Sequence, residues 1–221
     1  MIRLENLSLK LNENDLLLSN LNLFIPSGHL VGITGPPASG KTRLFKVLGL
    51  QENASSGNLY VLGKNTQKLE RDEIANLHNE ISLVEETNDL IYNLEVKENI
   101  ILPLIAMNKR RGDIEIALNE LVAWLKIEEI LKKNVLCLSQ YEQKIVQFSR
   151  AIITRPRILL LDNFFVNIDS ELQKKTSYLL LALKKIGTTI IIFNADKNDS
   201  LLEYNDTYEI KNLSLINISI L

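Results

Sequence analysis

The chain has a single cysteine, no long apolar run and no excess of charge of either sign. Its 221 residues include 25 Lys and Arg against 27 Asp and Glu, a net charge of −2, so no basic surplus indicates a nucleic-acid partner. One cysteine, Cys137, excludes an intramolecular disulfide and a cysteine-rich metal site. Because it stands between Leu136 and Leu138, we expect it to be a small buried hydrophobe.

The longest apolar run falls well short of the ~20 residues of a transmembrane helix. It is the stretch YLLLAL at 178–183, and Lys184 follows it at once. The N-terminal stretch MIRLENLSLK carries Arg3 and Glu5 and therefore has no signal-peptide core. We expect the chain to remain in a cytoplasm-like compartment. With 46% hydrophobic and 24% charged residues, its composition is that of an ordinary globular protein.

Two periodicities alternate along the chain. Short apolar runs predict strands, and apolar residues spaced by three and four predict helices. The expected strands are 2–11, 16–25, 29–34, 57–63, 81–84, 158–162, 188–193, 207–210 and 213–220. The expected helices are 42–50, 96–107, 113–127, 139–153, 170–185 and a short one near 199–204. Buried strands that alternate with helices indicate an α/β fold with a parallel sheet covered on both faces, and the middle of the chain is an all-helical insertion.

A glycine-rich turn lies between the strand expected at 29–34 and the next helix. Its sequence GPPASGKT fits G-x-x-x-x-G-K-[ST], and strand–turn–helix is the context that this pattern requires. Backbone N–H groups of such a loop surround a phosphate, Lys41 adds a positive charge, and the Thr42 hydroxyl coordinates Mg²⁺. The alternative is a plain turn whose glycines only reverse the chain. The candidate phosphate-binding residues are Gly35, Pro36, Pro37, Ala38, Ser39, Gly40, Lys41 and Thr42.

A single aspartate ends an apolar strand much further along the chain. The stretch RPRILLLDN places Asp162 at that position. A carboxylate at the carboxyl end of a parallel strand, beside a phosphate loop, holds the hydration shell of magnesium. We therefore expect Asp162 and Thr42 to share a Mg²⁺ site. A strand-ending aspartate that only starts a turn is the alternative.

With these motifs in place, the whole chain resembles the nucleotide-binding subunit of an ABC transporter. The stretches GPPASGKT, ISLVEE, LSQYEQK, ILLLDN, NID and IIIFNAD correspond in order to the family's phosphate loop, Gln loop, signature, Walker B, D-loop and switch. The stretch LEVKENIILPL is also similar to the LTVxENVxxPL run of the branch that contains cell-division and lipoprotein-export ATPases.

The resemblance implies a P-loop NTPase fold with a mostly parallel sheet, an N-terminal antiparallel β region and a helical subdomain. It implies one domain over 1–221, with a core of about 1–86 and 155–221 and a helical subdomain of about 87–154. ATP and Mg²⁺ are the implied cofactors. The implied partners are a second copy or a second ABC ATPase, and a transmembrane permease-like subunit that docks near 86–94. The chain is then a peripheral protein on the cytoplasmic face of the inner membrane.

Several positions depart from the family pattern, and they are the ones that carry the chemistry. The family's glutamate after the Walker B aspartate is Asn163 here, which bonds a water but does not take its proton at neutral pH. The switch histidine falls on Ala195, which has no donor. The Gln-loop position is Glu86, which is a candidate metal ligand. Its carboxylate adds negative charge near the γ-phosphate. The adenine-stacking aromatic falls near Leu11, and no aromatic residue precedes Phe24.

The signature keeps Ser139, but the two glycines that follow it in the family are Gln140 and Tyr141 here. In the family this motif opens a helix that points at the γ-phosphate bound by the opposite subunit, so Ser139 is a candidate nucleotide contact. The two Cβ-bearing residues obstruct the close backbone approach that glycine permits. Ser139 and Glu142 also form a capping-box pattern that starts a helix in any protein. Whether Ser139 meets nucleotide stays open.

Three functions stay open. The first is an ATP- and Mg²⁺-binding subunit of a membrane-associated ABC-type complex with weak or absent hydrolysis, a pseudo-ATPase. The second is an active transport ATPase that uses another base. The third is a scaffold that binds no nucleotide, and the intact Lys41, Thr42 and Asp162 speak against it.

Overall fold

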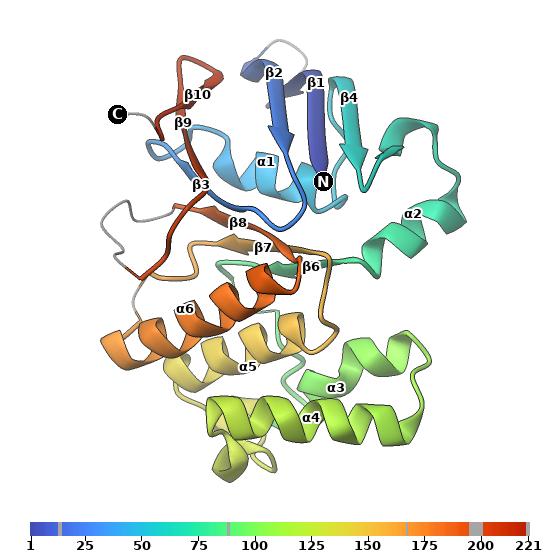
Figure 1. Ribbon diagram of the computed structural model, residues 1–221, viewed down its shortest axis with the longest axis vertical. Coiled ribbons are helices and arrows are strands. Elements are labelled where there is room, and N and C mark those ends of the chain that lie inside the picture. Colours follow the sequence, from blue (N-terminus) through green and yellow to red (C-terminus); the bar gives the residue numbers. More distant parts are fainter. Residues whose placement is uncertain (13–14, 88, 167, 195–200, 220–221) are drawn as a thin grey trace.

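Two sheets form the frame of the molecule (Figure 1). The computed structural model describes residues 1–12, 15–87, 89–166, 168–194 and 201–219. The first sheet is antiparallel, with strand order β2-β1-β4-β5. Its strands are β1 (Ile2–Lys10), β2 (Leu16–Ile25), β4 (Ser56–Val61) and β5 (Lys64–Asn65). It is the expected N-terminal antiparallel region.

The second sheet is parallel except for one edge strand, and its order is β10-β9-β3-β8-β7-β6. Its strands are β3 (Leu30–Thr34), β6 (Ile81–Val84), β7 (Ile158–Asp162), β8 (Thr189–Phe193), β9 (Asp206–Lys211) and β10 (Ser214–Asn217). Because β3, β8, β7 and β6 run in the same direction, the loops after their carboxyl ends meet at one edge of the sheet.

Helices cover both faces of the parallel sheet, as Figure 1 shows. The α-helices are α1 (Lys41–Leu48), α2 (Arg71–His78), α3 (Val96–Ala106), α4 (Arg111–Leu125), α5 (Gln140–Ile152) and α6 (Ser170–Lys185). Three short 3₁₀ helices are Thr66–Lys68, Glu128–Ile130 and Val135–Cys137. In the described part of the chain, no helix combines the length and the apolar character needed to cross a membrane.

The parallel strands separate two hydrophobic cores. On β7, Ile158 and Leu160 face one core together with α1 and the antiparallel sheet, whereas Leu159 and Leu161 face the other core together with α3, α4, α5 and α6. Successive strand residues point to opposite faces, so a strand that is buried on both faces requires a continuous apolar run. The run ILLL supplies it, and Asp162 is the first polar residue after it.

Three details differ from the sequence-based expectations. Cys137 is exposed rather than buried, because it ends a 3₁₀ turn in which only Val135 points into the core. The expected short helix near 199–204 is absent from its described residues 201–204, and the rest lies outside the described residues. Helix α2 was not expected, because Leu77 is its one buried residue and the helix has no apolar stripe.

Candidate nucleotide site

The phosphate loop joins β3 to α1 at the carboxyl edge of the parallel sheet. Gly40 precedes α1 with φ of 95°, a conformation that glycine adopts without strain. A Cβ at this position would also lie 2.9 Å from Leu17 Cγ of β2. Helix α1 has no side-chain cap and no acidic residue in its first turn. Its N-terminal N–H groups and the positive end of the helix dipole are therefore suited to an anion.

Lys41 folds back over this loop. Its Nζ donates hydrogen bonds to the carbonyl oxygens of Gly35 at 2.8 Å and Pro36 at 2.7 Å, and a longer one of 3.4 Å to Ser39 Oγ. Burial lowers the pKa of the Lys41 ammonium, and the nearby Asp162 carboxylate opposes that shift. The loop therefore has a positive charge at its centre, as the sequence predicts for a phosphate cradle.

Asp162 lies next to the phosphate loop although it comes from β7. Its Oδ2 accepts a hydrogen bond of 3.2 Å from Thr42 Oγ1, and its Oδ1 is buried without a hydrogen-bond partner. Burial raises the pKa of this carboxyl group, as does the charge of Glu86, while the Thr42 hydrogen bond lowers it. A buried, unpartnered carboxylate oxygen beside a hydroxyl is a hard oxygen pair that fits Mg²⁺. The structure thus brings together the two residues that we expected to share a metal.

Asn163 follows Asp162 in the left-handed conformation, with φ of 51°. Its side-chain Oδ1 accepts a hydrogen bond of 2.6 Å from Asn194 Nδ2, which stands at the end of β8. Asn194 also has a positive φ of 55°. The acceptor oxygen of Asn163 is thus engaged within the protein. Ala195, expected at the switch position, lies outside the described residues.

Glu86 belongs to the segment that follows β6. It is exposed, and no contact of Glu86 with Thr42 or Asp162 is present among the described residues. Its charge is nevertheless close enough to raise the pKa of Asp162. The neighbouring Glu85 is held by Gln51, whose Nε2 donates a 2.7 Å hydrogen bond to its Oε1. Glu86 therefore stands at the rim of the site and contacts neither of the two oxygen ligands.

Ser139 is placed far from the phosphate loop of its own chain. It caps α5, which packs on the face of the parallel sheet opposite to α1 (Figure 1). Ser139 Oγ accepts from the Glu142 N–H at 3.2 Å, and Glu142 Oε2 accepts from the Ser139 N–H at 2.8 Å. The capping box predicted from the sequence is confirmed. Gln140 is exposed, whereas Tyr141 is partly buried and packs against the core.

The position expected for a base-stacking aromatic residue holds an aliphatic side chain. Leu11, the position expected for it, is 58% exposed in the turn that its N–H closes onto Asp15 O. The adjoining strand β2 borders the phosphate loop, because a Cβ at Gly40 would lie 2.9 Å from Leu17 Cγ. An aliphatic surface therefore stands where the resemblance implies a stacking ring.

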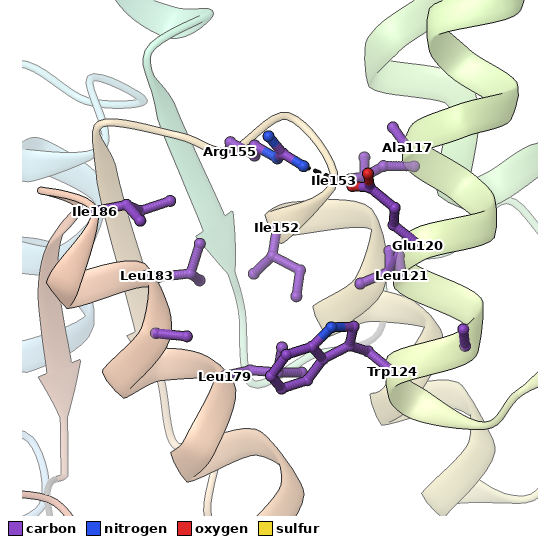
Figure 2. Close-up of a pocket in the computed structure, with 12 residues that line it drawn as sticks. Ala117, Glu120, Leu121, Trp124, Ile152, Ile153, Arg155, Leu179, Leu183 and Ile186 are labelled. Atoms are coloured by element: carbon purple, nitrogen blue, oxygen red, sulfur yellow. Dashed lines mark hydrogen bonds and ion pairs between the residues drawn. The ribbon is translucent and has the colours of Figure 1, made fainter.

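A separate pocket lies away from the phosphate loop (Figure 2). It has a volume of about 610 Å³, and an ion pair of 2.6 Å between Arg155 and Glu120 crosses one side of it. Its lining comes from α4, from the end of α5 with the turn after it, and from α6, and consists of Ala117, Glu120, Leu121, Ala123, Trp124, Ile152, Ile153, Arg155, Leu179, Ala182, Leu183 and Ile186. None of the residues expected to bind nucleotide lines it.

Three residues at the site were missed by sequence reasoning. Asn194 bonds to Asn163, Lys144 bonds to the turn after β7, and Gln147 bonds to the segment after β6. An amide directly after the strand at 189–193 was a usable signal for Asn194. Lys144 and Gln147 carry no such signal, because their contacts depend on how α5 packs against the sheet.

Comparison with known proteins adds an independent finding. A family model described as ABC transporter matches residues 18–166, a region that includes the phosphate loop and Asp162. The chain is 28% identical over 200 residues to the lipoprotein-releasing system ATP-binding protein LolD 1 of Rhodopirellula baltica, and this match covers 90% of the chain and 87% of the relative. It is 27% identical over 201 residues to the spermidine/putrescine import ATP-binding protein PotA of Mannheimia succiniciproducens. That second match covers 90% of the chain but 52% of PotA, so the chain spans about half the length of this relative.

The fold is also similar to solved structures. The chain superposes on a dimeric structure of the ATP-binding cassette MJ0796 in a post-hydrolysis state, bound to ADP and Pi, with a TM-score of 0.86. Sequence identity is 26%, and the superposition covers 97% of this chain and 96% of that one.

Proposed function

Because the chain belongs to the ABC transporter family, we propose that it is an ATP- and Mg²⁺-binding subunit that hydrolyses ATP weakly or not at all. Domains of this family bind ATP with Mg²⁺, and the family's ATP-binding subunits work with transmembrane permeases and form dimers.

Binding is supported by the phosphate loop and the adjacent oxygen pair. Lys41 Nζ lies over the loop backbone, and the uncapped N-terminus of α1 presents donors to an anion. Thr42 Oγ1 and Asp162 Oδ1 are the atoms that would hold Mg²⁺, which neutralises phosphate charge when bound. Gly35, Pro36, Pro37, Ala38, Ser39 and Gly40 complete the loop.

The observation that carries the weak-hydrolysis proposal is the hydrogen bond between Asn163 Oδ1 and Asn194 Nδ2. A general base must accept a proton from water, and the oxygen of an engaged, neutral amide does not do so. Loss of a general base costs ~10² to 10⁴ in rate. The side-chain NH₂ of Asn163 remains able to donate, so this residue is suited to hold a phosphate oxygen or a water in place.

The partners follow from the same proposal. We assign residues 1–86 and 155–221 to the nucleotide-binding core and 87–154 to the helical subdomain. A transmembrane permease-like subunit docks near 86–94, and the chain is then peripheral on the cytoplasmic face of the inner membrane. The dimer partner is a second copy or another ABC ATPase, whose nucleotide Ser139 would approach from α5. A bound triphosphate then serves as a ligand that stabilises the closed pair by differential affinity.

Thermal unfolding and phosphate release, measured on the same sample, test this function. Magnesium-ATP should raise the melting temperature while phosphate release stays at background. Lys41→Ala should abolish the thermal shift. The matched variant Lys46→Ala should keep it, because Lys46 lies on the same helix but pairs with Glu52. Phosphate release that disappears in Lys41→Ala identifies an active ATPase instead, and a missing thermal shift in the wild-type chain identifies a scaffold.

A further inference from the structure

Helix α5 sends polar side chains across to the nucleotide site. Lys144 and Gln147 are spaced by three and lie on one face of the helix. Lys144 reaches the turn that follows β7, and Gln147 reaches the segment that follows β6. Since β6 and β7 are paired in parallel, both contacts fall at the same edge of the sheet, where Asp162 ends its strand.

Lys144 is fixed by three backbone carbonyl groups. Its Nζ donates to Val166 O at 2.9 Å, Phe164 O at 3.1 Å and Asn163 O at 3.4 Å. Three acceptors match the three donors of an ammonium group. The turn is also anchored by the buried Phe164 ring, whose centroid lies 5.1 Å from that of Phe148 on α5. The positive charge of Lys144 is therefore held in one place, next to the residue that follows Asp162.

The charges around this position are mostly negative. Asp162, Glu85 and Glu86 bring three carboxylates to the strand ends, and the charges of both glutamates raise the pKa of Asp162. Lys41 is committed to the phosphate loop on the other side of Asp162. On the glutamate side, Lys144 is a cation on which the charge of Glu86 acts, and Arg150 of the same helix is paired with Asp89. Without Lys144, the negative charge that a further phosphate group meets on that side would be offset less.

We propose that Lys144 is a positioning and specificity-determining residue that lets this site prefer a nucleoside triphosphate over a diphosphate. The inference rests on the proposed function. In this proposal the loop amides and Lys41 hold the phosphates shared by both ligands, and the extra phosphate of the triphosphate extends toward Asn163, where the fixed ammonium of Lys144 offsets the nearby carboxylates. By fixing the turn, Lys144 also holds Asn163 in its left-handed conformation.

Calorimetric titration of the full chain with magnesium-ATP and magnesium-ADP tests the inference. In Lys144→Met, the ratio of ATP to ADP affinity should fall about tenfold, because the loss of one fixed charge acts mainly on the extra phosphate. Lys144→Gln keeps amide donors for the carbonyl groups but removes the charge, and it should lower the ratio similarly. Lys144→Arg keeps the charge and should preserve the ratio within about threefold.

Lys184→Met is the matched control. Lys184 also donates to a backbone carbonyl, that of Glu203 at 3.2 Å, but it lies at the end of α6. This variant should leave both affinities unchanged. If Lys144→Met and Lys144→Gln bind both nucleotides equally more weakly, so that the ratio of ATP to ADP affinity is unchanged, the inference is overturned. Lys144 then only stabilises the turn after β7. A wild-type chain that binds neither nucleotide overturns the proposed function, and the inference with it.

Discussion

Asn163 and Asn194 stand at the ends of neighbouring strands, and both have positive φ. Asparagine adopts the left-handed conformation more readily than most other residues, because its short polar side chain bonds locally. Both residues therefore suit their backbone conformation, and a short hydrogen bond joins their side-chain amides. A glutamate at 163 would have to adopt the left-handed backbone conformation, which it disfavours, and its side chain would lie next to Asn194.

A double-mutant cycle measures the strength of this bond. Asn163→Gly and Asn194→Gly each remove an amide while leaving positive φ unstrained. The two changes should couple by about 0.5–1.5 kcal/mol in the free energy of unfolding, the usual net worth of a neutral hydrogen bond. Chemical denaturation of the wild type, both single variants and the double variant gives the coupling. Additive effects would show that the two side chains do not interact.

Asp162 gives a pH-dependent prediction. Burial raises the pKa of its carboxyl group, so the folded chain binds this proton more tightly than the unfolded chain does. Stability is then lost as pH rises from the ordinary pKa of an aspartic acid to the raised value, and it stays lower above that window. Asp162→Asn has no charge to bury, so it should be more stable than the wild type at pH 8.

Urea unfolding of both chains between pH 4 and pH 8 checks this sign. The advantage of Asp162→Asn should shrink as pH falls, because the wild-type carboxyl group becomes protonated in both states. A wild type that is the more stable chain at pH 8 contradicts the prediction. Asp162→Asn should also lose the magnesium dependence of nucleotide binding.

Some of these residues were predictable from the sequence and others were not. Lys41, Thr42 and Asp162 lie in motifs that follow strands expected to be parallel, so their meeting at one sheet edge could be predicted. Asn194, Lys144 and Gln147 meet their partners through long-range packing, which no local pattern encodes. The prediction that Cys137 is buried was wrong, because flanking leucines do not show which way a short 3₁₀ turn faces.

At the scale of the element, α5 connects the helical insertion to the strand ends. Gln147 is buried, and its Nε2 donates to Thr87 O at 2.9 Å and to Asp89 Oδ1 at 3.0 Å, with Glu85 O at 3.4 Å. Arg150 on the same helix forms an ion pair with Asp89. The segment that carries Glu86 is therefore held to α5 on both sides of that residue.

Gln147→Ala should release this segment. The variant loses the hydrogen bonds to Thr87 and Asp89, which should cost about 0.5–1.5 kcal/mol of stability per bond, and amide hydrogen exchange should accelerate over 85–90. The exposed Gln140 in the same helix provides the control, and Gln140→Ala should change stability by less than ~0.5 kcal/mol. Exchange rates over 85–90 that match those of the wild type would mean that α5 does not hold the segment.

The sequence predicts some helices better than others. The capping box at Ser139 and Glu142 located the start of α5 correctly, and the apolar spacing located α1, α3, α4 and α6. Helix α2 was missed because its signals are of another kind. It begins with a capping box of two glutamates, Glu70 and Glu73, and it buries only Leu77. A short helix fixed by its cap rather than by an apolar face leaves little periodicity to read.

At the scale of the whole molecule, the strand ends that form the proposed site adjoin elements from both cores. The phosphate loop belongs to the core of α1, and Lys144 belongs to α5 in the other core. Magnesium-ATP at ~100 times its dissociation constant should therefore raise the melting temperature of the whole chain by about 5–10 °C. Removing magnesium with a chelator should reduce this shift, because Thr42 and Asp162 then have no metal to hold.

Thr42→Ala should behave with magnesium present as the wild type does without it, and Thr42→Ser should keep the full response because it retains the hydroxyl. A shift that is equal with and without magnesium would show that these two residues do not form a metal site.

The identity of the bound nucleotide after long incubation is the most direct measurement. The purified chain is incubated with magnesium-ATP for hours, separated from free nucleotide, and denatured so that the released nucleotide can be analysed. If the cradle for the triphosphate is intact and the proton acceptor is missing, the bound nucleotide should still be ATP. Recovery of ADP in its place, or of no nucleotide at all, would contradict the proposal.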